Sequence, residues 1–227
     1  MAEIDWDALS RSIDVFSSEE YAPILHQFYP WAVDRLDDRD LEPRTILDLG
    51  CGTGLLSEKL VEWYPEASLT LVDANPSMIA RARERLGHHE AVAIVESTLE
   101  RALAETPNET VEMMIFCRSW YALPDPDAVA ARAMEVLAPH GLVFLFDFTR
   151  PIDVAQQDAF YQDLEPEQWP DCRVLTIDFA EGLRAGHYRV YSEAEITAQW
   201  RACGAELVAY ETHEPDQPNH RVCFGKA

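Results

Sequence analysis

Residues 45–54 read TILDLGCGTG, an apolar run that ends in a glycine-rich turn. A short apolar run bounded by such a turn is typical of a buried strand, and residues 55–63 then carry leucines at helical spacing. Gly50, Gly52 and Gly54 allow the backbone to turn sharply and to approach a ligand closely. The start of the following helix adds free N–H groups and a positive dipole end. This strand, turn and helix predict a site for a nucleotide-like cofactor.

Strand-like and helix-like segments alternate outward from this unit. Further strands are expected at 68–73, 91–95, 111–117 and 141–148, because these runs are short and apolar. Helices are expected at 76–86, opened by Pro76 and closed by Gly87, and at 99–105 and 127–138. Apolar strands separated by helices indicate an α/β fold, with a parallel sheet covered on both faces.

The 227 residues suffice for one domain with a full core. We divide residues 1–227 into a helical N-terminal cap (1–42), a cofactor-binding core (43–150) and a C-terminal substrate-side segment with closing strands (151–227). Within the last part, residues 174–179 are expected to form a strand or part of a lid, residues 192–203 a helix, and residues 206–212 and 221–224 a closing pair of strands. The aromatic residues of 151–170 are expected to form a lid over an apolar acceptor or a small satellite core.

The charge balance argues against several function classes. Forty-one acidic residues face 18 basic ones, for a net charge of −23. Such a chain is repelled by phosphate backbones, which disfavours nucleic acid as a partner. Abundant Asp and Glu with almost no Lys also suit a protein kept soluble at high salt. No apolar run reaches the roughly 18 residues of a membrane helix, and the N-terminus is acidic, so a cytoplasmic location is expected. No CxxC pair or spaced histidines predict a metal site.

The spacing of the glycines distinguishes two cofactor classes. The dinucleotide fingerprint G-x-G-x-x-G fails, because it would end at Leu55 or at Ser57. The chain instead reads D-x-G-x-G-x-G from Asp48. A carboxylate beside the turn would repel a pyrophosphate, whereas it would attract a cationic amino-acid group. Asp73, at the end of the next strand, suits a grip on ribose hydroxyls. The pattern therefore favours S-adenosyl-L-methionine over NAD.

With these residues in view, the sequence resembles the class I S-adenosylmethionine-dependent methyltransferases. Residues 46–54 resemble the first motif of that family and residues 71–78 the second. Residues 136–142 resemble the crossing from a helix into strand five, and residues 204–212 resemble a late strand. The resemblance implies a Rossmann-like three-layer sandwich with a mostly parallel seven-stranded sheet and an antiparallel late strand. It covers residues 40–150 well and the tail loosely.

The resemblance also implies roles for individual residues. Asp48 and the backbone around Cys51 would hold the methionine end, Asp73 the ribose, and Cys117 would offer its backbone carbonyl to the cofactor's amino group. Thr98 stands where the family usually has an aspartate at the adenine amino group, which is a departure and implies a weaker contact. The complete set of expected cofactor contacts is Tyr21, Asp48, Gly50, Cys51, Gly52, Gly54, Asp73, Ala74, Met78, Thr98, Leu99 and Cys117. For several of these residues a purely structural role is the alternative: packing for Gly54, core for Met78, helix capping for Thr98.

Residues of the acceptor site are expected beyond the carboxyl ends of the strands. The chain reads CRSW at 117–120, where family members that methylate nucleic-acid bases or protein amides often carry N/D-P-P-Y/F. Arg118 is a candidate contact for a substrate carboxylate or phosphate, or else an ion pair with the acidic surface. Tyr121 is a further candidate. Asp147 is a candidate base or substrate anchor, or else a cap or a partner of Arg150.

The sequence thus predicts transfer of a methyl group from S-adenosyl-L-methionine to an O or N atom of a small-molecule acceptor, with S-adenosyl-L-homocysteine as product. In-line displacement from a sulfonium needs alignment and exclusion of water, and it needs a base only where the acceptor must lose a proton. Two alternatives stay open: an NAD-dependent oxidoreductase, and a non-catalytic partner protein that binds S-adenosylmethionine. A macromolecular acceptor ranks lower.

Overall fold

The computed structural model describes residues 9–10, 13–14, 17, 19, 22–153, 155, 169–213 and 218–226, with only the backbone at 169–172. Strands and helices alternate through most of this range. The elements are α2 (Pro23–Asp37), β1 (Thr45–Leu49), α3 (Ser57–Trp63), β2 (Ser68–Asp73), α4 (Pro76–Leu86), β3 (Val92–Glu96), α5 (Leu99–Glu105), β4 (Val111–Cys117), the 3-10 turn η1 (Trp120–Ala122), α6 (Pro126–Val136), β5 (Leu137–Phe148), α8 (Trp169–Ala185), α9 (Glu193–Ala202), β6 (Ala205–Thr212) and β7 (Asn219–Lys226).

The strands form one seven-stranded sheet in the order β3-β2-β1-β4-β5-β7-β6. The first five strands of this order pair in parallel, and β7 runs antiparallel to both of its neighbours, β5 and β6. The order reverses between β1 and β4, which is the switch point where open α/β sheets bind ligands. The predicted mostly parallel sheet with an antiparallel late strand is confirmed.

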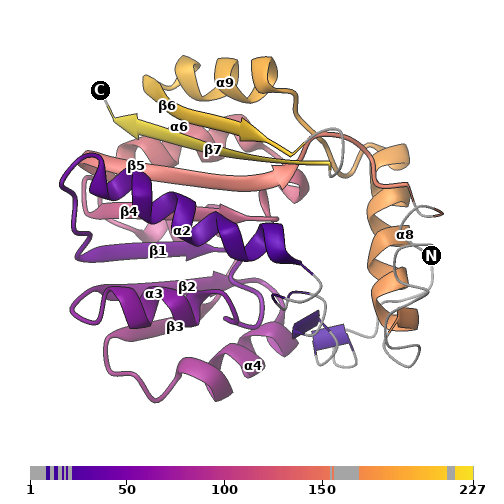
Figure 1. Cartoon of the computed structure of the whole chain (residues 1–227), viewed down its shortest axis with the longest axis horizontal. Coiled ribbons are helices and arrows are strands. Elements are labelled where there is room, and N and C mark those ends of the chain that lie inside the picture. Colours follow the sequence, from indigo (N-terminus) through magenta and orange to yellow (C-terminus); the bar gives the residue numbers. More distant parts are fainter. Residues whose placement is uncertain are drawn as a thin grey trace.

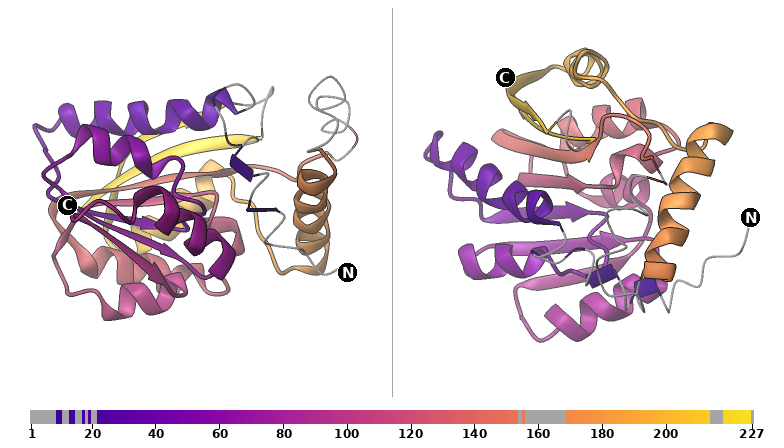
Figure 2. Two further views of the ribbon diagram at one scale, coloured as in Figure 1. Left: turned by 90° about the horizontal axis from the view of Figure 1, so that it is seen from below. Right: turned by 45° about the vertical axis from the view of Figure 1, so that its right-hand side comes forward.

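Helices cover both faces of the sheet, as Figures 1 and 2 show. One core packs α2, α3 and α4 against the sheet and includes Phe28, Leu60 and Phe144. The other packs α5, α6 and α9 against the opposite face and includes Val129 and Trp200. The result is the three-layer sandwich expected of near-continuous apolar strands.

Helix starts follow sequence signals that the chain supplies locally. In α4, Pro76 occupies the first turn, and the Asn75 side chain accepts hydrogen bonds from the backbone N–H groups of Ser77 (2.9 Å) and Met78 (3.3 Å). A capping box of Ser192 and Glu195 opens α9. These caps fix where each helix begins and therefore where each preceding loop meets the carboxyl edge of the sheet.

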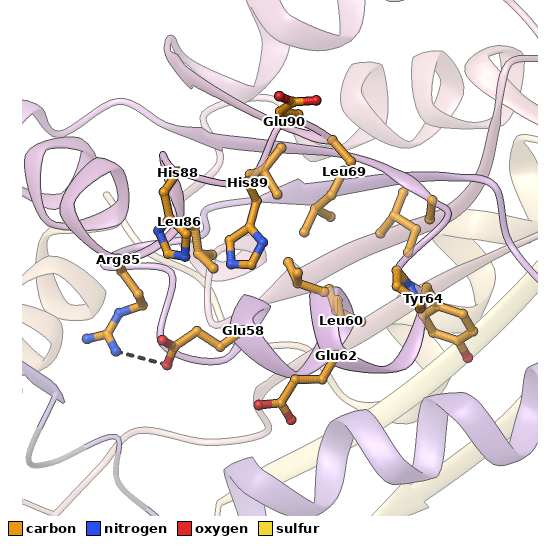
Figure 3. Close-up of a pocket in the computed structure, with 16 residues that line it drawn as sticks. Glu58, Leu60, Glu62, Tyr64, Leu69, Arg85, Leu86, His88, His89 and Glu90 are labelled. Carbon is orange, nitrogen blue, oxygen red and sulfur yellow. Dashed lines mark hydrogen bonds and ion pairs between the residues drawn. The ribbon is translucent and has the colours of Figure 1, made fainter.

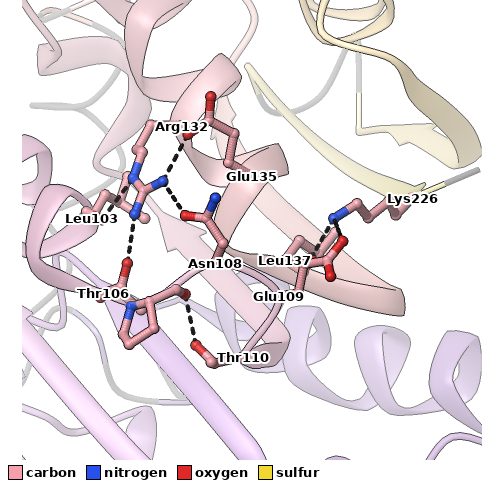
Figure 4. A network of polar contacts seen from close by, with 10 residues as sticks. Leu103, Thr106, Asn108, Glu109, Thr110, Arg132, Glu135, Leu137 and Lys226 are labelled. Atoms are coloured by element: carbon pink, nitrogen blue, oxygen red, sulfur yellow. Dashed lines mark hydrogen bonds and ion pairs between the residues drawn. The ribbon is translucent and has the colours of Figure 1, made fainter.

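Polar contacts tie the opposite, amino-terminal edge together (Figure 4). Arg132 of α6 donates to the carbonyls of Leu103 (3.0 Å) and Thr106 (2.6 Å), and also bonds Asn108 and Glu135. Lys226 at the end of β7 donates to the carbonyl of Leu137 (2.9 Å). These bonds hold the connection between α5 and β4 against α6, away from the predicted cofactor turn.

Residues 174–179 lie inside α8, so the strand alternative expected there is wrong. The β-branched residues of this run favour a strand. The buried positions Thr176, Phe179 and Gly182 instead recur every third residue, as on one face of a helix. Gly182 is required there, since a Cβ would lie 2.1 Å from the ring of Tyr188. In Figure 1, α8 stands beyond the carboxyl ends of the parallel strands.

The other boundaries differ by a few residues. Helix α6 ends at Val136 rather than 138, and β5 begins at Leu137 rather than 141. Strand β3 is shifted by one residue toward Glu96. Among the helices in the described ranges, none combines the length and the apolar character that crossing a bilayer requires.

Candidate cofactor and acceptor site

The glycine turn between β1 and α3 adopts a conformation that other residues rarely take. Gly50, Gly52 and Gly54 have φ angles of +88°, +55° and +74°. A Cβ at Gly50 would lie 2.5 Å from the Cβ of Ser119, and one at Gly54 would lie 3.3 Å from Leu86. At Gly52 no atom lies within 4 Å of such a Cβ. Gly50 and Gly54 therefore serve close packing, whereas the backbone at Gly52 is open to a ligand.

The turn is anchored to the end of β2, which brings Asp73 beside it. The N–H groups of Gly50 and Cys51 donate to the carbonyl of Val72 at 2.8 and 3.0 Å. The N–H of Gly52 donates to Oδ2 of Asp73 at 3.0 Å, and the N–H of Asn75 donates to Oδ1 at 2.8 Å. Burial raises the pKa of Asp73 above its ordinary value. Each carboxylate oxygen keeps acceptor capacity for hydroxyl groups of a ligand.

Asp48 on β1 is buried, with 1% of its surface exposed. Its Oδ2 accepts hydrogen bonds from the hydroxyls of Ser57 (2.7 Å) and Tyr29 (3.4 Å), whereas Oδ1 is buried without a partner. Burial raises the pKa of Asp48 to about 6. Buried carboxylate oxygens are normally paired, so the orphaned Oδ1 fits a cationic group supplied by a ligand. Together with the open backbone at Gly52, this donor set fits the amino-acid end of S-adenosylmethionine.

The residues expected around the adenine lie at the ends of β2 and β3. Ala74 is exposed directly after β2, and Met78 is buried at the start of α4. Thr98 caps α5, where its hydroxyl accepts a hydrogen bond from the N–H of Arg101 at 3.3 Å, and Leu99 beside it is half-buried. The structural alternatives for Gly54, Met78 and Thr98 are thus present in the geometry. Tyr21 lies outside the described residues.

Ser97 is a candidate that sequence reasoning missed. Its hydroxyl is buried without a hydrogen-bond partner, and its N–H donates to the carbonyl of Asp73 at 3.0 Å. Ser97 therefore lies beside Asp73, the residue predicted to bind the ribose, and one residue before Thr98. A lone serine in a loop carries no sequence signal that would single it out.

Arg118 follows β4 and lies against the end of β5. Its backbone has a positive φ of 52°, and its N–H donates to the carbonyl of Phe146 at 2.7 Å. Its guanidinium lies over the rings of Phe146 and Phe148, at 5.6 and 5.2 Å from their centroids. Its Nε is buried without a partner. The expected alternative, an ion pair with surface carboxylates, is not found within the part of the chain that the structure describes.

Asp147, near the end of β5, is buried and engaged by backbone N–H groups. Its Oδ2 accepts from Tyr121 at 3.0 Å, and its Oδ1 accepts from Phe148 at 2.8 Å. Burial raises its pKa to about 7, although these bonds and the charge of Arg118 oppose the rise. The carboxyl thereby fixes η1 to the end of β5. This geometry favours the capping alternative for Asp147 over a free base.

Tyr121 belongs to an aromatic cluster that joins the end of β5 to α8. Its ring centroid lies 5.7 Å from Phe148, 4.9 Å from Phe179 and 5.2 Å from Tyr188. The pairs are edge-to-face, a favoured arrangement for aromatic rings. Burial raises the pKa of Tyr121, so its hydroxyl stays neutral at physiological pH. The cluster packs Phe179 of α8 against Tyr121 and against Phe148, one of the rings that Arg118 covers.

A surface pocket lies away from these residues. It is bounded by α3, α4 and the amino-terminal ends of β2 and β3, with Glu58, Tyr64, Arg85, His88 and His89 in its lining (Figure 3). It contains none of the residues predicted for the cofactor or the acceptor. Within the described ranges, no group of three or more His, Cys, Asp or Glu side chains could hold a metal ion.

A family model described as a methyltransferase domain matches residues 19–210. The chain belongs to the class I S-adenosylmethionine-dependent methyltransferases. This membership supplies the cofactor, S-adenosyl-L-methionine, and sets aside the nicotinamide-dependent alternative.

Curated relatives of this methyltransferase include the malonyl-[acyl-carrier protein] O-methyltransferase of Halalkalibacterium halodurans, 30% identical over 66% of this chain and 52% of that protein. The ubiquinone biosynthesis O-methyltransferase of Pseudomonas aeruginosa strain PAO1 is 32% identical over 58% of this chain and 56% of that protein. The match thus spans about half the length of these relatives.

Solved structures of similar fold include a methyltransferase from Aquifex aeolicus described as dependent on S-adenosylmethionine. It has a TM-score of 0.63 and 17% identity, and the match covers 96% of this chain and 98% of that one. The N-methyltransferase NodS of Bradyrhizobium japonicum WM9, solved with S-adenosyl-L-homocysteine, has a TM-score of 0.60 and 18% identity, over 91% and 87% of the two chains. At these identities the likeness concerns the fold.

Proposed function

We propose that this methyltransferase transfers the methyl group of S-adenosyl-L-methionine to an O or N atom of a small-molecule acceptor. One observation carries the proposal: Ser119, in the segment that follows β4, lies directly on the glycine turn. Ser119 packs against Gly50 and donates a hydrogen bond to the carbonyl of Leu49 at 2.7 Å. Arg118 and Tyr121, on either side of Ser119, therefore border the end of the turn where the methionine group of the cofactor would lie.

On this proposal, the cofactor is held by the residues that resemble the family motifs. Asp48 and the backbone around Gly52 bind the amino-acid end, Asp73 binds the ribose, and the carbonyl of Cys117 accepts from the cofactor's amino group. The remaining contacts in the described structure line the turn or flank the adenine: Gly50, Cys51, Gly54, Ala74, Met78, Thr98 and Leu99. Tyr21, outside the described residues, stays a predicted contact. When bound, the cofactor supplies an activated methyl group on a sulfonium.

The protein itself then aligns the acceptor with the cofactor and excludes water from the site. Phe148, Phe179 and Tyr121 supply apolar contact area at the carboxyl edge of the sheet. Asp147 acts as a positioning residue, because its hydrogen bonds to the N–H groups of Tyr121 and Phe148 hold η1 against β5. Arg118 contacts the acceptor.

Two features support a small acceptor over a nucleic acid. The net charge of −23 opposes a phosphate backbone, and residues 117–120 lack the N/D-P-P-Y/F pattern. Both curated relatives described above are O-methyltransferases by name, which supports an oxygen acceptor. Displacement on a nucleophile that keeps its proton needs no base, and the candidate base Asp147 is engaged by backbone N–H groups.

The first test is a calorimetric titration of the purified protein with S-adenosyl-L-homocysteine at low and at high salt. We expect one-to-one binding. The second test incubates the protein with methyl-labelled S-adenosylmethionine and a panel of hydroxy and amino compounds, and follows formation of S-adenosyl-L-homocysteine. Absence of binding at either salt would refute the proposal, whereas tight binding without turnover across the panel would support the non-catalytic alternative.

A further inference from the structure

Buried polar atoms without hydrogen-bond partners gather at the carboxyl edge of the sheet. Besides Oδ1 of Asp48 and the hydroxyl of Ser97, they include Nε of Arg118, Nε2 of His213 and Oδ1 of Asn219. The large majority of buried side-chain polar atoms in folded proteins have a hydrogen-bond partner. Three such groups lie near the proposed methionine end. We infer that a bound ligand supplies their missing hydrogen-bond partners.

Strand register and ring contacts place each of these three groups beside Phe146 or Phe148. Phe148 of β5 lies opposite Asn219 of β7 in an antiparallel pair, so their side chains project from the same face of the sheet. Phe146, two residues earlier, shares that face. The guanidinium of Arg118 lies over both rings, and the ring of His213 lies 6.5 Å from that of Phe146. We name Arg118, His213 and Asn219 the polar triad.

The triad carries one positive charge. Arg118 supplies that charge through its guanidinium group. Burial and the charge of Arg221 lower the pKa of His213 against the opposing charge of Glu211, and this shift favours the neutral imidazole. Asn219 is uncharged and 2% exposed. Among the described residues no ion pair includes Arg118, although its charge acts on the nearby Asp147 carboxyl, whose two oxygens already accept from backbone N–H groups.

We propose that the acceptor carries a carboxylate that binds Arg118, and that His213 and Asn219 hydrogen-bond its neighbouring polar groups. The planar guanidinium matches a carboxylate through two parallel hydrogen bonds. A single arginine compensates one negative charge, and a dianionic phosphate would keep an uncompensated charge inside an acidic protein. This proposal rests on the proposed function, because it names the acceptor class of the same site.

The test uses matched fragment pairs that differ only in charge, and it measures binding rather than turnover. Benzoate and benzamide, 4-hydroxybenzoate and 4-hydroxybenzamide, and hexanoate and hexanamide are titrated by ligand-observed NMR onto the protein saturated with S-adenosyl-L-homocysteine. We expect the carboxylates to bind about tenfold more tightly than their amides, the range expected for a charged hydrogen-bonded partner. Equal affinities within every pair, or no carboxylate binding at all, would overturn the proposal.

Variants assign the preference to the triad. Arg118→Gln is expected to remove the difference between acid and amide, and His213→Gln to reduce it. Arg201→Gln is the matched control, since Arg201 is exposed in the last turn of α9, next to the start of β6 at the opposite edge of the sheet. A preference that survives in folded Arg118→Gln, or that disappears in Arg201→Gln, would place the carboxylate elsewhere.

The two proposals fail in different ways. Loss of the proposed function shows as no binding of S-adenosyl-L-homocysteine, which is measured without any fragment. Loss of the acceptor proposal shows as cofactor-product binding with no discrimination within the fragment pairs. Thermal unfolding of each variant separates a lost contact from a lost fold.

Discussion

Lowering the pH should weaken cofactor binding through Asp48. The carboxyl is buried, its pKa is raised to about 6, and its Oδ1 has no partner within the described structure. The ionised form attracts the ammonium of the cofactor's amino-acid end, and the protonated form does not. The ammonium itself stays charged below neutral pH, so Asp48 is the group whose titration controls this contact.

The size of the effect follows from that pKa. At about pH 5, one unit below it, roughly one tenth of the molecules carry an ionised Asp48. The dissociation constant for S-adenosyl-L-homocysteine should therefore rise roughly tenfold between about pH 8 and about pH 5, which is about 1.4 kcal/mol. Asp73, whose pKa is also raised, shifts the effect in the same direction.

Protonation of Asp48 has the opposite effect on folding of the free protein: it raises the free energy of unfolding. The folded state binds the Asp48 proton more tightly than the unfolded chain, so this carboxyl contributes stability that is present below its ordinary pKa of 3.8 and lost as pH rises through about 6. Bound cofactor offsets that loss, because its cation lowers the pKa of the carboxyl.

The assay is calorimetric titration across this pH range in two buffers of different ionisation enthalpy, which also counts the protons exchanged. Asp48→Asn is the matched variant, since it keeps an acceptor for Ser57 and Tyr29 and removes the charge. It should bind more weakly at about pH 8 and show a flatter pH profile. A pH-independent affinity in the unmodified protein, or an equally steep profile in Asp48→Asn, would refute the reasoning.

Three further predictions follow from the same structure. Asp73→Ala should weaken binding of S-adenosyl-L-homocysteine by about 1–3 kcal/mol, and an unchanged affinity in the folded variant would exclude the ribose role. Trp200→Ala should lower the free energy of unfolding by about 3–5 kcal/mol in a denaturant titration, because Trp200 is fully buried against Phe224 and Trp120. Trp63→Ala, at a 39% exposed position, should lower the free energy of unfolding far less. The unfolding temperature should rise with KCl into the molar range, as salt screens the net charge of −23, and a flat response would exclude adaptation to high salt.

The sequence was most informative where local chemistry decides the structure. Strands β1, β2 and β4 and helices α4 and α5 have the predicted bounds, because apolar runs, Pro76 and Gly87 mark them locally. Helix α8 was misjudged because its β-branched residues favour a strand, whereas its burial repeats at helical spacing. The three-part division of the chain stays a prediction.

The acceptor side of the site depends on contacts that no local pattern contains. The positive φ of Arg118 and its position over two rings follow from packing between β4 and β5. Asn219 and His213 join Arg118 only because β7 pairs antiparallel with β5, about a hundred residues along the chain from Arg118. A sequence pattern could place the cofactor motif, whose residues lie close together along the chain, but it could not assemble this long-range triad.

The charges of Asp48 and Arg118 indicate how the cofactor and the acceptor are positioned relative to each other. Asp48 lies on β1, and Arg118 follows β4, the neighbouring strand in the sheet. On the proposals made above, the negative group binds the cofactor's cation and the positive group binds the acceptor's anion, with Ser119 and Gly50 in contact between them. An acceptor carboxylate would be repelled at Asp48 and attracted at Arg118. Charge would then fix the orientation of both partners along the line of methyl transfer, which is the contribution that an in-line displacement requires from the protein.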